Sequence, residues 1–179
     1  MTDETKQKLM KAALELFAKE GYKGATTLAI SETAGFSEVT LFRKFGNKKN
    51  LFTSVLIQNY EKLKNDLDSI IIDKEFENPR DFLEILIRNL LKLGENNFEF
   101  IKLTVNESRR ISGNFLEELV NNLSEYIEKN IQNKEIDYKI FVFDILAFMY
   151  LLLLGYGGVF MDHEGAIERF INNQALCIQ

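Results

Sequence analysis

The chain has 179 residues, of which 46% are apolar, enough for one sizeable core or two modest domains. A single cysteine, Cys177, and a single histidine, His163, exclude an intramolecular disulfide, a multi-cysteine zinc site and a histidine cluster. The net charge of −5 is unusual for a nucleic-acid-binding protein, yet residues 1–54 carry nine Lys/Arg against six Asp/Glu, so the basic charge gathers near the N-terminus.

No grouping typical of an enzyme stands out in the chain. A Ser/His/Asp triad would have to use His163, and the glycines at 155, 157 and 158 lie in an apolar run rather than in a phosphate-binding loop after a strand. The polar, acidic start at Met1–Glu4 does not resemble a secretory signal. We therefore expect a cytoplasmic, non-enzymatic protein with no metal and no cofactor.

The N-terminal third predicts a series of capped helices. Apolar residues at helical spacing (Leu9, Ala13, Leu16 and Phe17) predict a first helix over residues 3–20, which Gly21 ends in a left-handed conformation. Three residues that can cap a helix then follow, each before a helical pattern: Thr26, Ser37 and Asn47. They predict a helix ending at Gly35, a short helix to about Phe45, and a long helix towards Ile72.

The rest of the chain is also predicted to be helical. Asn78-Pro79 combines a cap with a proline at the first helical position. No segment alternates at period two over the length of a strand, so the fold class is all-α. The expected helices cover residues 79–93, 95–107, 114–132, 138–161 and 164–177.

Two short helices joined by Ala34-Gly35-Phe36-Ser37 have the layout of a helix-turn-helix. Gly35 permits the positive φ that so tight a turn needs. A helix of this kind can enter the major groove of DNA, and an ordinary three-helix core is the alternative. Its outward side chains would be Ser37, Glu38, Val39, Thr40, Phe42, Arg43 and Lys44.

Five spaced segments strengthen the first interpretation. They are Leu14–Tyr22, Thr26-Thr27, Ile30–Gly35, Thr40–Phe45, and Asn47-Lys48 with Leu51. Together they closely resemble the N-terminal domain of the tetracycline-repressor (TetR) family, over about the first third of the chain. The resemblance implies a DNA-binding domain over residues 1–47 and a helical ligand-binding and dimerisation domain over 48–179.

Site residues follow from the resemblance. It implies that Thr26, Thr27 and Lys48 meet phosphates, an interaction that fits hydroxyls, backbone amides and an ammonium group at helix starts. The recognition helix would span Glu38–Lys44. The candidate contacts in the groove are Ser37, Val39, Thr40, Phe42, Arg43 and Lys44, with Val39 placed to touch a thymine methyl.

The sequence departs from the family pattern at three positions of this helix. Phe42 stands where the family usually has tyrosine, so a phenolic phosphate contact is lost. Val39 replaces a smaller residue, and Lys44 replaces an aromatic residue or histidine. Glu38 could accept a hydrogen bond from a cytosine amine or merely interact favourably with the helix dipole. These differences change the expected operator sequence rather than the fold.

Residues 140–161 form an apolar run with Asp144 as its only charge. A membrane-spanning helix is one interpretation, opposed by that charge and by the glycines. The other is a helix buried on both sides, by its own domain and by a second subunit. The family resemblance implies that this helix and the final one build a dimer interface, in which Gly155 and Gly158 would allow close approach.

Aromatic residues in the C-terminal two-thirds suggest a pocket for an apolar effector. The candidate lining residues are Phe98, Phe115, Asp144 and Phe148, and a structural role for Asp144 remains the alternative. The sequence therefore predicts a homodimeric, ligand-responsive repressor of palindromic double-stranded operator DNA, with no membrane association. A membrane-tethered DNA-binding regulator is the alternative.

Overall fold

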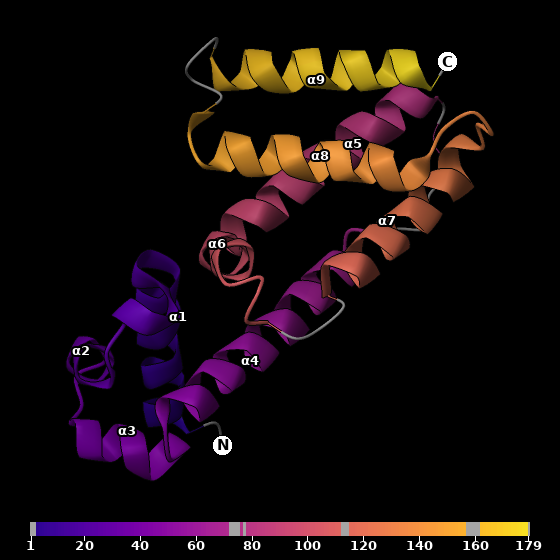
Figure 1. The fold of residues 1–179 in the computed structure, drawn as a ribbon. Coiled ribbons are helices and arrows are strands. Elements are labelled where there is room, and N and C mark those ends of the chain that lie inside the picture. Colours follow the sequence, from indigo (N-terminus) through magenta and orange to yellow (C-terminus); the bar gives the residue numbers. More distant parts are fainter. Residues whose placement is uncertain (1–2, 72–75, 77, 112–114, 157–161, 179) are drawn as a thin grey trace. The chain divides into compact units, whose positions relative to one another are not determined.

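The computed structural model describes residues 3–71, 76, 78–111, 115–156 and 162–178 (Figure 1). In these ranges every regular element is a helix, so the all-α prediction is confirmed. The helices are α1 (Glu4–Gly24), α2 (Thr27–Thr33), α3 (Glu38–Phe45), α4 (Lys48–Asp68), α5 (Pro79–Asn96), α6 (Phe98–Asn106), α7 (Phe115–Ile131), α8 (Tyr138–Leu153) and α9 (His163–Cys177).

The helix starts follow the predicted caps. Thr26 and Ser37 accept hydrogen bonds from the amides of Ala29 and Thr40, and Asn47 Oδ1 accepts from the amide of Asn50. Asn78 Oδ1 does the same for Asp81 at the start of α5. Each cap satisfies an amide that the first turn of a helix leaves without a carbonyl partner, which explains why these boundaries could be predicted.

The described chain divides into two compact units. Unit 1 comprises Met1–Lys64 and Asn97–Gly113, and unit 2 comprises Asn65–Asn96 and Asn114–Gln179. Unit 1 therefore includes α6 in addition to the three N-terminal helices and most of α4. The functional division between residues 47 and 48 stays a prediction.

Unit 1 is built on the apolar face of α1. Leu9, Ala13 and Phe17 are buried, as their spacing predicts, and Leu103 of α6 belongs to the same core. The other helices contribute buried side chains to it as well, among them Ile30, Leu41, Phe45, Leu51, Phe52 and Val55. The DNA-binding candidate segment thus shares its core with α6, which lies far from it in the sequence.

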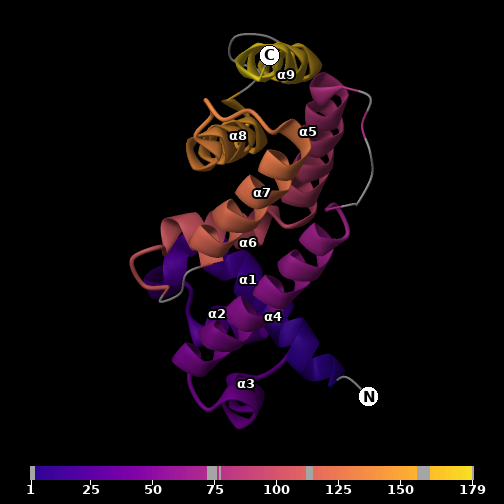
Figure 2. The same cartoon turned by 90° about the vertical axis from the view of Figure 1, so that its right-hand side faces the viewer.

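Unit 2 consists of α5, α7, α8, α9 and the end of α4. Its helix α5 packs on α7, α8 and α9, and in Figure 2 the four helices are seen from a second side. At the surface Arg88 bridges α5 and α9 through Glu164 and Glu168, with N–O distances of 2.6 and 2.7 Å. The ring of Phe148 stacks on that of Phe170, with centroids 3.9 Å apart, and links α8 to α9.

Helix α8 differs from its prediction in length. It ends at Leu153 rather than at residue 161, and Gly155 follows with a φ of +86°, a conformation that ends a helix. The expectation that Gly155 lies inside the helix was therefore wrong, and Gly157 and Gly158 lie outside the described residues. One face of α8 is buried in unit 2, whereas apolar side chains remain exposed on the other: Ile140, Phe143, Leu151 and Leu154.

No helix within the described ranges is both long enough and apolar enough to cross a membrane.

Candidate nucleic-acid interface

The helix-turn-helix has the predicted geometry. Helices α2 and α3 are joined through Gly35, whose φ of +78° lies in the left-handed region. The amide of Phe36 then donates to the carbonyl of Ser31 at 2.8 Å, which closes the turn. Ile30 of α2 and Leu41 of α3 are fully buried in the core that they share with α1. The pair is therefore fixed on the core of unit 1, with α3 at its edge (Figures 1 and 2).

The outward face of α3 carries the predicted groove residues. Val39 is 77% exposed and Phe42 is 44% exposed, values that are high for apolar side chains in a helix that also has a buried face. Arg43 and Lys44 are exposed, and Thr40 is half-buried beside Ser37, with 3.0 Å between their hydroxyl oxygens. This face combines cationic and apolar groups, which suits phosphates and thymine methyls.

Two of the predicted DNA-contacting residues are bonded to carboxylates. The hydroxyl of Thr27 donates to Glu38 Oε1 at 2.5 Å, and Lys44 Nζ donates to Asp3 Oδ2. Asp3 is also the N-cap of α1, where it accepts from the amide of Lys6. The Lys44 ammonium holds the pKa of Asp3 below its usual value. Sequence reasoning missed both bonds, because nothing in the local pattern indicates them.

Lys48 lies at the start of α4, as predicted, and is also held by protein groups. Its Nζ is 4.8 Å from the centroid of the Tyr22 ring and 3.5 Å from the carbonyl oxygen of Lys23. Partial burial, and then the charge of Arg110, lower the pKa of the Lys48 ammonium, while Glu107 opposes this shift. A cation over an aromatic face is attracted by the ring quadrupole, so Lys48 has a defined position.

The effector candidates are divided between the two units. Phe98 belongs to unit 1, whereas Phe115, Asp144 and Phe148 belong to unit 2. Asp144 is exposed on α8, and Phe148 is occupied by its stack with Phe170. Their role as ligand contacts stays a prediction.

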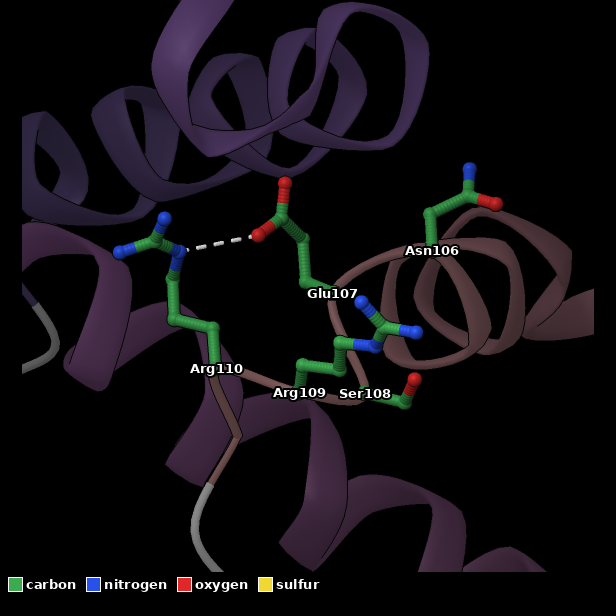
Figure 3. A pocket seen from close by; sticks show the side chains of 5 residues that line it. All are labelled: Asn106, Glu107, Ser108, Arg109 and Arg110. Atoms are coloured by element: carbon green, nitrogen blue, oxygen red, sulfur yellow. Dashed lines mark hydrogen bonds and ion pairs between the residues drawn. The ribbon is translucent and has the colours of Figure 1, made fainter.

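Two hollows in the described part of the chain are lined by side chains other than these four. One, of about 470 Å³, opens on the turn after α6 and is lined by Asn106, Glu107, Ser108, Arg109 and Arg110 (Figure 3). The other, in unit 2, holds only about 10 Å³ and is lined by Ile70, Phe76, Phe82, Ile85, Leu86, Asn89 and Tyr126. Neither is a large apolar cavity ready to take an effector.

The fold and this surface define the class of protein: an all-helical chain with an N-terminal helix-turn-helix domain. The profile of "Bacterial regulatory proteins, tetR family" matches residues 9–55. The chain belongs to the TetR family.

Relatives extend the likeness beyond that domain. The chain is 31% identical over 122 residues to "Uncharacterized HTH-type transcriptional regulator YvkB" of Bacillus subtilis (strain 168), covering 68% of this chain and 59% of that protein. It is 27% identical over 106 residues to "HTH-type transcriptional repressor NicS" of Pseudomonas putida, covering 59% and 49%. The chain thus spans about half to three fifths of the length of the curated relatives it matches.

Among solved structures the likeness covers nearly the whole chain. AibR, in complex with isovaleryl coenzyme A and operator DNA, superposes with a TM-score of 0.72 at 15% identity, over 93% of this chain and 96% of that one. At so low an identity the superposition shows a shared fold.

Proposed function

We propose that the chain is a homodimeric, ligand-responsive transcriptional repressor that acts on palindromic operator DNA in the cytoplasm. The observation that carries this proposal is the exposed, cation-bearing face of α3 on a rigid helix-turn-helix. Family membership supports it, as does the similarity to NicS, a transcriptional repressor.

In this proposal the residues of unit 1 divide into two sets. Thr26, Thr27 and Lys48 bind phosphates and so fix the position of the domain on the duplex. The second set faces the base edges in the major groove and consists of Ser37, Val39, Thr40, Phe42, Arg43 and Lys44. Phe42 has no hydroxyl, so it contributes apolar contact alone.

A second copy of the chain is the proposed partner of α8. The exposed residues Ile140, Phe143, Leu151 and Leu154 recur at 3, 11 and 14 residues from the first, so they share one helix face, and the exposed Asp144 lies at the side of this face. Exposure of such a face to water is unfavourable, and its burial against a matching face lowers the free energy. Two-fold pairing would also place two recognition helices on the two halves of a palindrome.

The effector is proposed to bind unit 2. Two proteins of similar fold were solved with acyl-coenzyme A ligands: AibR with isovaleryl coenzyme A, and FadR of Bacillus subtilis with stearoyl-CoA. A small, apolar effector would suit the aromatic side chains Phe82 and Tyr126 of unit 2, but it would have to widen the hollow that they line, which holds only about 10 Å³. It would release DNA only if it bound the non-binding conformation more tightly than the DNA-bound one.

The test begins with sequencing the DNA fragments that the purified protein retains at physiological salt, followed by mobility shifts on the selected site. The double variant Arg43→Ala with Lys48→Ala is expected to lose operator affinity and to keep its oligomeric state. Lys92→Ala with Lys134→Ala removes the same charge from exposed positions of unit 2 and serves as the control. Equal affinities of the two double variants across a salt series would contradict the assigned interface.

A further inference from the structure

Glu107 connects the turn after α6 to the junction between α1 and α2. Its Oε1 accepts a hydrogen bond from the backbone amide of Tyr22 at 2.8 Å, across 85 residues of sequence. Its Oε2 accepts from Arg110 Nε at 3.0 Å (Figure 3). Only 16% of the side chain is exposed, so this carboxylate is a largely buried, fully used acceptor in unit 1.

Gly21 creates the space for this contact. Its φ of +73° and ψ of 169° interrupt α1, so the amide of Tyr22 turns to the carboxylate. A Cβ on residue 21 would lie 3.0 Å from Glu107 Oε1, tighter than nearly all contacts of real Cβ atoms. The backbone conformation and the missing side chain are therefore both needed for Glu107 to reach Tyr22.

The ring of Tyr22 carries two cations. Arg110 lies with its guanidinium carbon 4.5 Å from the ring centroid, and Lys48 with its Nζ at 4.8 Å. On the protein side the ring is packed against Phe17 and Phe52, with centroids 5.9 and 4.9 Å away. Because these aromatic neighbours are part of the core of unit 1, the ring is a fixed platform for both cations.

The Glu107 carboxylate offsets one of the two positive charges around this platform. Two cations that share one ring repel each other, and this repulsion is partly screened because the Arg110 side chain is 41% exposed. The Glu107 carboxylate pairs with Arg110 and offsets its charge beside Lys48. With a neutral side chain at position 107, Arg110 would keep its charge and lose its partner, and Lys48 would be pushed from its place.

We propose that Glu107 is a positioning residue for DNA binding, which acts through Tyr22 and Arg110 to hold Lys48 where it meets the operator phosphate. Glu107 itself does not touch DNA. The inference rests on the proposed function, because it needs a phosphate contact by Lys48. By this inference, the turn after α6 supports the DNA-binding surface in addition to the recognition helix.

A double-mutant cycle on the operator fragment tests this role. Glu107→Gln keeps an oxygen acceptor for the Tyr22 amide and removes the charge. We expect it to weaken binding roughly tenfold for each subunit, the size of one lost charge-assisted interaction, and to reduce the slope of log K against log salt by about 0.9 for each subunit that contacts the operator. In a Lys48→Ala background the same change is expected to have no further effect, because the group through which it acts is gone.

Two further variants separate positioning from folding. Glu99→Gln, on an exposed position of α6, is the matched control and should bind like the wild type. Removing the unpaired cation should rescue the defect, so Glu107→Gln with Arg110→Gln is expected to recover most of the affinity. Thermal unfolding of each variant checks that the domain is folded, and Glu107→Asp provides an ionised replacement if Glu107→Gln does not fold.

The outcomes are distinct for the two proposals. Equal losses in the wild-type and Lys48→Ala backgrounds, an unchanged salt slope, or the absence of rescue would overturn the role of Glu107 and leave operator binding intact. A wild-type protein that retains no specific DNA, or a Lys48→Ala variant that binds normally, would overturn the phosphate contact and the positioning role together.

Discussion

Thr27 donates its hydroxyl proton to Glu38, and this 2.5 Å bond joins the first residue of α2 to the first residue of α3. It fixes the direction of a carboxylate at the start of the proposed recognition helix. A fixed carboxylate near a groove can accept from a cytosine amine, and it repels phosphates that approach it. The bond therefore bears on base preference as well as on the stability of the turn.

Glu38→Gln is expected to change which sequence is selected. The amide retains an acceptor for Thr27 and removes the negative charge, so binding to unrelated DNA should strengthen while discrimination at one position of each half-site falls. One base contact of this kind is worth about 1–3 kcal/mol. Sequencing of retained fragments and competition with unrelated DNA measure both effects.

The control for this experiment is Glu32→Gln, an exposed residue at the end of α2 with the same change of charge. If both variants select the same sequence and gain the same affinity, Glu38 has no role in base preference.

The Asp3–Lys44 pair predicts a pH dependence of stability. The hydrogen bond from Lys44 lowers the pKa of Asp3 from its ordinary value of 3.8. A carboxyl group with a lowered pKa in the folded state stabilises the fold above its unfolded pKa, and this contribution disappears as the pH falls through the folded value. Asp3→Asn keeps the helix cap and loses the ion pair.

Chemical denaturation of wild type and Asp3→Asn between pH 7 and pH 2 checks this expectation. The two proteins should differ slightly at neutral pH, because the pair is exposed and screened, and should converge at acidic pH. Lys44→Gln should reproduce the same convergence, whereas a difference that persists at the acidic end would show that the ion pair is not its source.

Gly21→Ala is expected to destabilise unit 1. Its φ and ψ of 73° and 169° lie in a region used almost exclusively by glycine, where another residue costs about 1–3 kcal/mol. The added Cβ would also crowd Glu107. Gly35→Ala is the comparison, because it has a similar φ of +78° but meets no described atom within 4 Å. Denaturation midpoints should fall further for Gly21→Ala than for Gly35→Ala, and the reverse order would contradict the crowding at Glu107.

Phe143→Glu is expected to convert the proposed dimer into a monomer. It places a charge in the exposed apolar face of α8, where burial against a second copy would leave that charge unpaired. Leu116→Glu in α7 is a matched control, since both side chains are 57% exposed in the single chain. Sedimentation of the wild type and the two variants measures their oligomeric states. A Phe143→Glu variant that sediments like the wild type would place the partner surface elsewhere.

Most of the fold could be predicted because the signals are local. Thr26, Ser37 and Asn47 cap their helices through atoms three residues away, and Gly35 adopts the positive φ that its turn requires. The end of α8 was missed for a related reason. Its apolar pattern continues past Leu153, and hydrophobicity alone does not indicate that the helix ends before Gly155.

The candidate site was only partly predictable, because its remaining contacts are long-range. Asp3 and Lys44 are 41 residues apart, and Tyr22 and Glu107 are 85 apart. Glu107 appears in the sequence as one of several surface-like acidic residues. Only the packing of α6 on α1 brings it to the platform that holds Lys48.

The platform at Tyr22 also has an optical consequence. The chain contains six tyrosines and no tryptophan, so tyrosine emission is not masked by a stronger fluorophore. Tyr22 lies directly beneath two cations, one of which is the proposed phosphate contact. Any movement of Lys48 towards DNA would change the electric field at this ring, and the difference between wild type and Tyr22→Phe would isolate its signal. The protein would thus carry its own spectroscopic reporter of the proposed operator binding, without an attached label.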